Sequence, residues 1–449
     1  MLIFFAVENW LSFRDRVEFS MAKSKERQHI ERLPYLDKYK IHILPIAAIY
    51  GGNASGKTNL FHALNFGRRL VIRGTQPDQE EIPVQPFLLD TDCQEKPCCF
   101  EFEILSDEDI CYRFGFAVTR KQVIKEYLTE ISKQNERCLY HRELDKMEWH
   151  PKYKNDKFLS YVFQGTRKNQ LFLTNSISQK VEFFRDVYNW FKNNLVLIAP
   201  DTRFNYSVLL DEKRPVYNRM KDVLPLLDTG ISDLGSKESE IENTFFFPEE
   251  LKIRLQEEMP ENISTQVIGP KNKRFVITKE KGKLKAKELI AYHSDIQGNK
   301  IAFDISQESD GTQRVIDLLP AFLNLTKDNP KKVYIIDELN RSLHPLLSRQ
   351  LLESYLNTCL PQSRCQLLFT THDIFLMEQS ILRRDEMWLL ERNNHGVSSL
   401  FSLSDYHKVR YDKDIRKSYL QGRFGGIPKF LLSGMLDSID YKEEGHHDT

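Results

Sequence analysis

The stretch from Ile43 to Leu64 reads ILPIAAIYGGNASGKTNLFHAL, and it decides the fold. Its first eight residues are an apolar run that predicts a buried strand, and the residues from Asn59 onward predict a helix. The segment between them fits the pattern G-x-x-x-x-G-K-[ST] at every position. A glycine loop between a strand and a helix N-terminus surrounds phosphate groups with backbone N–H groups. The predicted phosphate-binding residues are Gly51, Gly52, Asn53, Ala54, Ser55, Gly56, Lys57, Thr58 and Asn59.

Two side chains of this loop have predicted roles. Lys57 is expected to reach the β- and γ-phosphates of a nucleoside triphosphate, and Thr58 to place its hydroxyl on Mg²⁺. The alternative is a chance match in a turn. The flanking strand and helix favour the phosphate loop, because the motif requires both.

Composition excludes some functions but does not select one. The chain has 449 residues with 64 basic and 64 acidic side chains, so no global charge drives it to nucleic acid or membrane. Its seven cysteines form no C-x-x-C pair, which indicates neither a zinc site nor a disulfide framework. The first residues lack a basic segment, and no apolar run is long enough to span a bilayer. We therefore expect a soluble cytoplasmic protein without membrane contact.

The order of patterns predicts an α/β fold with additions. The residues from Leu2 to Val7 read as a first strand, and 87–149 as an antiparallel meander, since apolar and polar residues alternate there. Residues 150–300 look mostly helical. Within them Lys271–Lys287 holds eight basic residues and one acidic residue, as a basic hairpin would. That hairpin is either a phosphate contact or a solvated sheet edge, and we favour the edge.

A second group of candidate residues follows two apolar runs. Asp337 and Glu338 end the run that begins at Lys332, as expected where a buried parallel strand delivers carboxylates. Asp337 is the predicted Mg²⁺ ligand, and Glu338 the predicted general base for the attacking water. His372 follows the next strand and can donate to the γ-phosphate. Ser309 can cap a helix whose N-terminus favours an anion, although capping alone would explain the residue.

These motifs together resemble the head of an ABC-type ATPase. The segment Ser309-Asp310-Gly311-Thr312-Gln313 stands at the place of the signature, and Asn340–Pro345 at that of the D-loop. The opening VENWLSF (7–13) and the closing YLQGRFGGIP (419–428) narrow the resemblance to the RloA/AbiLi type of bacterial abortive-infection proteins. These are relatives of the ATPases of OLD, Septu and PARIS systems. The resemblance covers nearly the whole chain and is weakest across 150–300.

The resemblance implies a division of the chain. Residues 1–150 would be the first ATPase lobe with the meander, 151–300 a mainly helical insertion or lid, 301–400 the second lobe and 401–449 a family-specific segment. It also implies that Ser309, Asp310 and Gly311 contact nucleotide. Asp310 replaces the second glycine of the usual signature. No segment matches the glutamine loop plainly, and Gln85 is a candidate for it. OLD nucleases continue into a nuclease domain, whereas only a short tail without an acidic cluster follows His372.

The predicted function is a Mg²⁺-dependent ATPase whose heads associate around ATP and control a separate effector, in defence against phage. The implied cofactors are ATP and Mg²⁺. The implied partners are further copies of the chain, as a dimer or a higher assembly, and a separately encoded nuclease-like protein, with DNA or a phage component as further ligands. One alternative is a DNA-repair head of the RecF/SMC kind. The absence of a sustained heptad pattern argues against SMC and its long-armed relatives but not against RecF. Others are an ATP-binding scaffold without turnover, which the intact Glu338 disfavours, and a transporter subunit.

Overall fold

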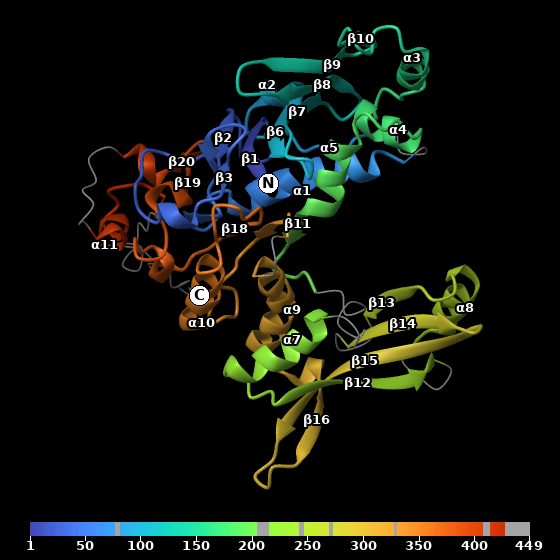
Figure 1. Cartoon of the computed structure of the whole chain (residues 1–449), viewed down its shortest axis with the longest axis vertical. Coiled ribbons are helices and arrows are strands. Elements are labelled where there is room, and N and C mark those ends of the chain that lie inside the picture. Colours follow the sequence, from blue (N-terminus) through green and yellow to red (C-terminus); the bar gives the residue numbers. More distant parts are fainter. Residues whose placement is uncertain are drawn as a thin grey trace, which may run out of the picture.

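The computed structural model describes residues 1–76, 81–203, 215–241, 247–268, 273–326, 330–406 and 414–426. Three larger sheets organise this part of the chain, and Figure 1 shows how they are arranged. Lys271 of the basic segment, Ile427 and Pro428 of the closing motif, and most of the predicted segment 401–449 lie outside the described residues.

The phosphate-binding stretch belongs to a six-stranded sheet of order β11-β17-β18-β5-β19-β20, in which only β20 is antiparallel to its neighbour. Alternate residues of β5 pack into two different hydrophobic cores. Ala47 and Ile49 belong to the first core, and Ile46 and Ala48 belong to the second. A strand buried on both faces explains the continuous apolar run in the sequence. The strands are β5 (Ile46–Gly51), β11 (Leu195–Ile198), β17 (Val333–Ile336), β18 (Gln366–Thr370), β19 (Met387–Arg392) and β20 (Ser398–Ser402).

An antiparallel sheet of seven strands covers one face of this arrangement, in the order β10-β9-β8-β7-β6-β1-β2. The helix α1 (Lys57–Arg73) packs against it. A Cβ atom on Gly67 would lie 2.6 Å from Phe102 Cζ, so the helix approaches β6 as closely as only glycine permits. The meander predicted over 87–149 is confirmed, and it pairs with β1 and β2 in this sheet. The strands of the sheet are β1 (Leu2–Glu8), β2 (Val17–Ser20), β6 (Cys98–Leu105), β7 (Cys111–Val118), β8 (Val123–Ile131), β9 (Glu136–Glu143) and β10 (Lys146–Trp149).

Two helices fill the opposite core. These are α9 (Asp310–Leu325) and α10 (Pro345–Leu356), whose apolar side chains pack with β5, β17 and β18. The parallel sheet therefore lies between α1 on one side and α9 and α10 on the other. The predicted α/β phosphate-loop head with an antiparallel subdomain is confirmed. Further helices are α2 (Thr91–Gln94), α3 (Lys157–Gln164), α4 (Phe172–Ser178), α5 (Arg185–Asn189), α7 (Pro215–Val223), α8 (Glu249–Glu258) and α11 (Ile415–Leu420).

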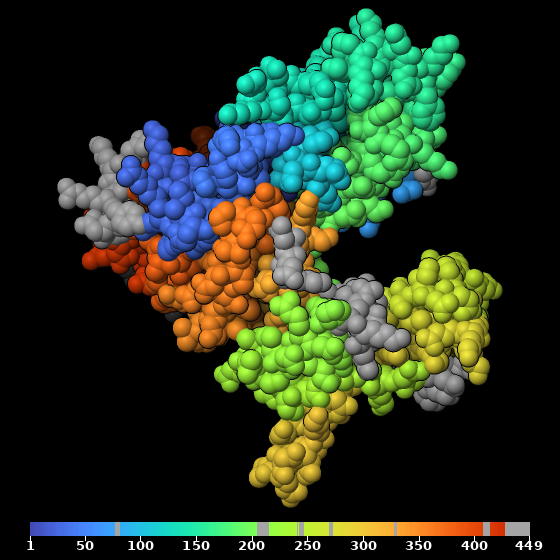
Figure 2. Space-filling view, in the orientation of Figure 1, coloured from blue at the N-terminus to red at the C-terminus, as the bar shows by residue number. Residues whose placement is uncertain are grey.

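The expectation of a mostly helical region over 151–300 is wrong for its second half. Residues 157–194 are mainly helical, but a five-stranded antiparallel sheet follows and forms a projecting lobe (Figure 2). Lysines and glutamates are frequent in β12 and β15, and these residue types have weak β-propensity, so the strands did not stand out in the sequence. The strands are β12 (Asp233–Glu240), β13 (Ser264–Ile268), β14 (Arg274–Glu280), β15 (Lys283–Ser294) and β16 (Lys300–Asp304), and we call them the insertion sheet.

The remaining pairing is short, between β3 (Tyr35–Leu36) and β4 (Ile41–His42). In the described part of the chain, no helix combines the length and the apolar character that crossing a bilayer would require.

Candidate functional site

The phosphate loop joins the carboxyl end of β5 to the start of α1. Its last glycine, Gly56, has a φ of 112°, which other residues rarely adopt. A Cβ atom there would lie 2.7 Å from Ser398 Oγ and 2.9 Å from Ser12 Oγ. Those two hydroxyls form a hydrogen bond of 2.8 Å, and Ser398 also donates to the carbonyl of Ser55 at 2.7 Å. The turn therefore requires glycine for its conformation and for the space behind it.

Lys57 is buried at the base of this loop. Its ammonium donates to the carbonyl oxygens of Gly51 at 2.9 Å and of Gly52 at 3.0 Å. Burial lowers the pKa of Lys57 to about 8, although nearby Asp337 and Glu338 act to raise it. A phosphate group would supply the missing charge, so the loop favours an anion.

A pocket of about 340 Å³ lies over the loop. The structure brings the predicted residues Glu338 and His372 into it, opposite Lys57. Arg392 also lines the pocket, and the sequence analysis missed it. It ends β19, whose parallel pairing places Leu390 opposite Gly51. No local motif announces Arg392, because only the strand order makes β19 the neighbour of β5. The described residues of its lining are Asn53–Asn59, Glu338, His372 and Arg392.

The carboxylate of Asp337 lies below this pocket and is 1% exposed. Its Oδ1 accepts a hydrogen bond from Thr370 Oγ1 at 2.5 Å, while its Oδ2 is buried without a partner. A buried, unpaired carboxylate oxygen is costly unless a cation or donor satisfies it. The Thr58 side chain is exposed at the start of α1. These oxygen donors fit Mg²⁺, which binds through one or two protein oxygens together with substrate phosphates.

Thr370 positions both acids. Its hydroxyl donates to Asp337 and accepts from the backbone N–H of Glu338 at 2.8 Å. Glu338 itself has a φ of 50°, a conformation that costs free energy in a residue with a side chain. The sequence alone gives Thr370 no role, because its function depends on the pairing of β17 with β18.

His372 is held by its backbone rather than its ring. Its N–H donates to Asn340 Oδ1 at 3.4 Å, and the same oxygen accepts from Thr371 Oγ1 at 2.9 Å. Desolvation and the charge of Lys57 lower the pKa of His372, against the opposing effect of Glu338 and Asp337. Asn340, the first residue of the predicted D-loop, thus fixes the loop that carries the histidine.

The predicted signature does not reach this pocket. Ser309 caps α9, because its Oγ accepts from the Thr312 N–H at 3.1 Å, as expected. A Cβ atom on Gly311 would lie 2.8 Å from the Ser342 carbonyl, so this helix end packs on the turn after Glu338. Ser309 and Asp310 are exposed. The described lining of the pocket includes none of the residues 309–311.

Two buried arginines connect α9 to its surroundings. Arg314 of α9 donates to the Asp337 carbonyl at 3.4 Å. Arg274 of the insertion sheet forms a bidentate ion pair with Asp317 of α9. Its Nη1 donates to Oδ1 at 2.5 Å, and its Nη2 donates to Oδ2 at 3.2 Å. Both members of that pair are almost fully buried. The insertion sheet is therefore linked through α9 to the carbonyl of the predicted metal ligand.

The C-terminal motif contacts the phosphate loop. The Gly52 N–H donates to the Gly426 carbonyl at 3.0 Å, and Tyr419 Oη donates to the same carbonyl at 2.9 Å. In the sequence, these residues indicate only the family resemblance.

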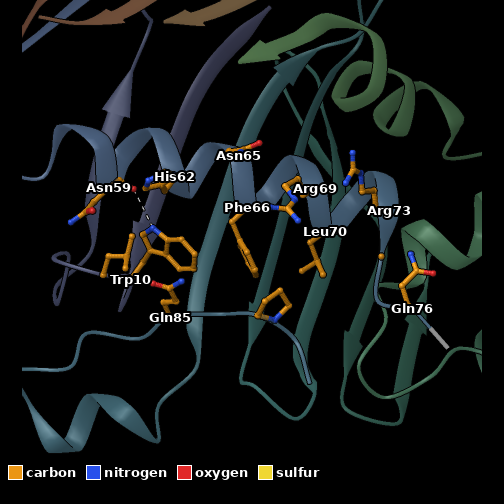
Figure 3. A pocket seen from close by; sticks show the side chains of 13 residues that line it. Trp10, Asn59, His62, Asn65, Phe66, Arg69, Leu70, Arg73, Gln76 and Gln85 are labelled. Carbon is orange, nitrogen blue, oxygen red and sulfur yellow. Dashed lines mark hydrogen bonds between the residues drawn. The ribbon is translucent and has the colours of Figure 1, made fainter. Parts of the chain in front are cut away.

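Gln85 lies elsewhere. It lines a separate cavity beside α1, which meets the phosphate loop only at Asn59 (Figure 3). Its carbonyl accepts from the Leu11 N–H at 2.9 Å. The assignment of Gln85 as a glutamine loop remains a prediction.

The basic segment forms the predicted hairpin, between β14 and β15. Its lysines face acids across the sheet. Lys285 pairs with Glu238 and Glu280, and Lys287 with Glu238, at 3.0 to 3.4 Å. These pairs favour a solvated surface over a phosphate contact, because the charges of Lys285 and Lys287 are already matched. The expected sheet edge is wrong, since β14 lies between β13 and β15, and β15 lies between β12 and β14.

Residues 46–378 match the family described as "AAA domain, putative AbiEii toxin, Type IV TA system". No curated protein matches the sequence. Among solved structures, the chain is similar to the SMC head domain from Thermotoga maritima, with 12% identity and a TM-score of 0.36, over 89% of this chain and 98% of that one. It is also similar to the recombination mediator RecF with ATP, with 14% identity and a TM-score of 0.35, over 89% and 97%. Values this low describe a distant likeness and carry no functional information.

Proposed function

The chain belongs to this AbiEii-type AAA domain family, and from that premise we propose that it is a Mg²⁺-dependent ATPase of the ABC type. Association of two heads around ATP would control a separate effector in bacterial defence against phage. The observation that carries the ATPase proposal is the convergence of Lys57, Glu338 and His372 on one pocket, with the unpaired oxygen of Asp337 beneath it.

The chemistry follows from these positions. Backbone N–H groups of the loop and the ammonium of Lys57 would hold the β- and γ-phosphates. Glu338 would accept a proton from the attacking water as that water forms a bond to the γ-phosphorus. His372 would donate a hydrogen bond to a γ-phosphate oxygen. The bond to the bridging oxygen then breaks, and ADP and phosphate are released.

The Mg²⁺ ion would be held by Thr58 Oγ1 and Asp337 Oδ2. Bound there, it would neutralise charge on the phosphates. Thr370 would keep the Asp337 carboxylate oriented for this task, because it already donates to Oδ1.

The dimer part of the proposal rests on α9. Its N-terminus has unsatisfied N–H groups and a positive dipole end, so it favours an anion. In an ABC-type arrangement that anion is the γ-phosphate held by Lys57 of a second copy. Each ATP would then lie between two chains, and association would depend on nucleotide by mass action.

The biological part of the proposal rests on the family. Its description refers to an AbiEii toxin of a type IV toxin–antitoxin system. We extend it to a defence role in which the ATPase restrains or releases a separately encoded nuclease-like partner. The finer assignment to the RloA/AbiLi type belongs to the same proposal and rests on the motifs at 7–13 and 419–428.

The test of the proposed function measures phosphate release from ATP by the full chain with Mg²⁺, with a chelator, and for Lys57→Ala. Release that needs Mg²⁺ and disappears in Lys57→Ala is the expected result. Release that persists in the variant would show that the phosphate loop is not the source of the activity and would contradict the proposal. The defence role is tested by counting phage plaques on cells that express the chain with its neighbouring reading frame, with Lys57→Ala as the control. Equal plaque counts would contradict that role.

A further inference from the structure

A second cavity lies beside α1, away from the phosphate loop, with a volume of about 610 Å³ (Figure 3). One side is formed by α1, and the other by the loop after β1 and the loop that contains Gln85. This volume is in the range of sites that bind small organic ligands. The proposed ATPase function gives the cavity no role.

The described lining of the cavity carries positive charge without an acidic partner. Arg69 and Arg73 lie one helical turn apart on α1, and both line it. Both are exposed, and no described residue forms a hydrogen bond or an ion pair with either guanidinium. The described lining residues include no carboxylate. By contrast, the neighbouring Arg68 donates to the Phe191 carbonyl at 3.0 Å. Two free, fork-shaped donors in one cavity favour phosphate or carboxylate groups.

The cavity also has an aromatic wall. The rings of Trp10 and Phe66 are 4.9 Å apart, and Trp10 Nε1 donates to the Asn59 carbonyl at 3.2 Å, which fixes the indole. Phe66 is half-buried and lines the cavity together with the amide of Gln85. These groups match the parts of a nucleotide. Cations bind its phosphate, an aromatic face stacks on its base, and an amide forms hydrogen bonds with the edge of the base.

The distance along α1 separates this cavity from the proposed ATP site. Arg69 and Arg73 follow Lys57 by 12 and 16 residues, which places them about 18 and 24 Å along the helix axis. Phosphates held by Lys57 therefore cannot also contact these arginines. We propose that the cavity is a second binding site, for a nucleoside phosphate, with Arg69 and Arg73 on the phosphates and Phe66 against the base. The source is either a free nucleotide or a single strand of nucleic acid.

The experiment uses the full chain with Lys57→Ala, so that the phosphate loop does not compete. Fluorescence anisotropy with 5′-labelled tetrathymidylate tests the strand, and calorimetry with AMP tests the free nucleotide. Adding Arg69→Gln and Arg73→Gln should weaken binding by at least ~10-fold, because each removes a charged hydrogen bond. Binding of the strand alone assigns a single strand, whereas binding of AMP assigns a free nucleotide.

Two controls make the result decisive. Lys121→Gln with Lys133→Gln removes the same charge from exposed positions outside the cavity and should leave binding unchanged. Phe66→Leu keeps an apolar side chain and should weaken binding through lost stacking. The arginine variant in the otherwise native chain should release phosphate from ATP at the native rate, which checks its folding. Absence of binding of both probes, or equal weakening by the lysine control, overturns the proposal.

Discussion

The two halves of the proposed nucleotide site differ in how far one chain completes them. In the phosphate-loop half, Lys57 is buried and held by two carbonyls, and Asp337 is oriented by Thr370. In the other half, the N-terminus of α9 is exposed, and Ser309 caps only its own helix. A preformed half can bind nucleotide in a single chain. An exposed helix N-terminus favours an anion from outside. Under the proposed function we therefore expect one chain to bind ATP and two chains to hydrolyse it.

The halves are nevertheless connected inside the chain. Arg314 links α9 to the Asp337 carbonyl, and the buried pair of Arg274 with Asp317 links α9 to the insertion sheet. The insertion sheet therefore contacts the helix that forms one half and, through Arg314 of that helix, is linked to the Asp337 backbone of the other half. Substitutions in the phosphate-loop half should therefore lower ATP binding or the chemical step, whereas substitutions at the N-terminus of α9 should lower hydrolysis while leaving ATP binding intact.

The largest effect is expected for Lys57→Ala. The change removes a buried cation that would make several charged hydrogen bonds to phosphate, so ATP affinity should fall more than ~10²-fold and hydrolysis should disappear. Equilibrium binding of a fluorescent ATP analogue measures this loss. Near-native affinity would show that the phosphate loop is not the nucleotide site.

The next effect is expected for Ser309→Arg, which changes the other half. ATP affinity should be nearly native because Lys57 is untouched, whereas hydrolysis should disappear, because the arginine occupies the place of the partner's phosphate. Light scattering of a Glu338→Gln protein with ATP, with and without Ser309→Arg, reports head association. Ser309→Ala is the matched control, since it loses the cap without adding bulk. Native turnover and native association in Ser309→Arg would exclude a composite site.

Glu338→Gln should have the third largest effect. The amide cannot accept the proton of the attacking water, so turnover should fall at least ~10²-fold while ATP still binds. Single-turnover hydrolysis measures the chemical step directly. Undiminished hydrolysis would remove Glu338 from this role.

A smaller loss is expected for Thr370→Val, which keeps the shape but removes the hydroxyl between Asp337 and Glu338. Turnover or Mg²⁺ affinity should fall about 10-fold, as is typical when a group that orients a metal ligand is lost. Measuring turnover over a range of Mg²⁺ concentrations distinguishes a lower maximal turnover from a lower affinity for Mg²⁺. Thr370→Ser keeps the hydroxyl and should stay near native, and an equal loss in both variants would indicate a packing defect instead.

The smallest effect is expected outside both halves, in the basic hairpin. Neutralising Lys279, Lys281, Lys283 and Lys285 should leave DNA binding unchanged, because acids and carbonyls already face several of these charges. DNA affinity measured across salt concentrations provides the check. A lower affinity with a flatter salt dependence would show instead that the hairpin contacts phosphates.

The sequence by itself determined the phosphate-loop half. The pattern from Gly51 to Thr58 is local, because a tight turn before a helix requires its glycines within a few residues. The Asp337-Glu338 pair and His372 were also predictable, since each directly follows an apolar run that can only be a buried strand. The strands of the meander were predicted for a similar reason, as their period of two was unobscured.

Only the tertiary structure decided the rest. The role of Thr370 depends on its strand lying beside β17, and Arg392 reaches the pocket because β19 pairs with β5. The insertion sheet was missed except for the basic hairpin, because its lysines and glutamates pair across neighbouring strands, and a cross-strand pair is not visible in one segment. The link from Arg274 to Asp317 spans distant parts of the chain and becomes a contact only when β14 packs on α9. Contacts between segments far apart in sequence carry no local pattern, so folding alone creates them.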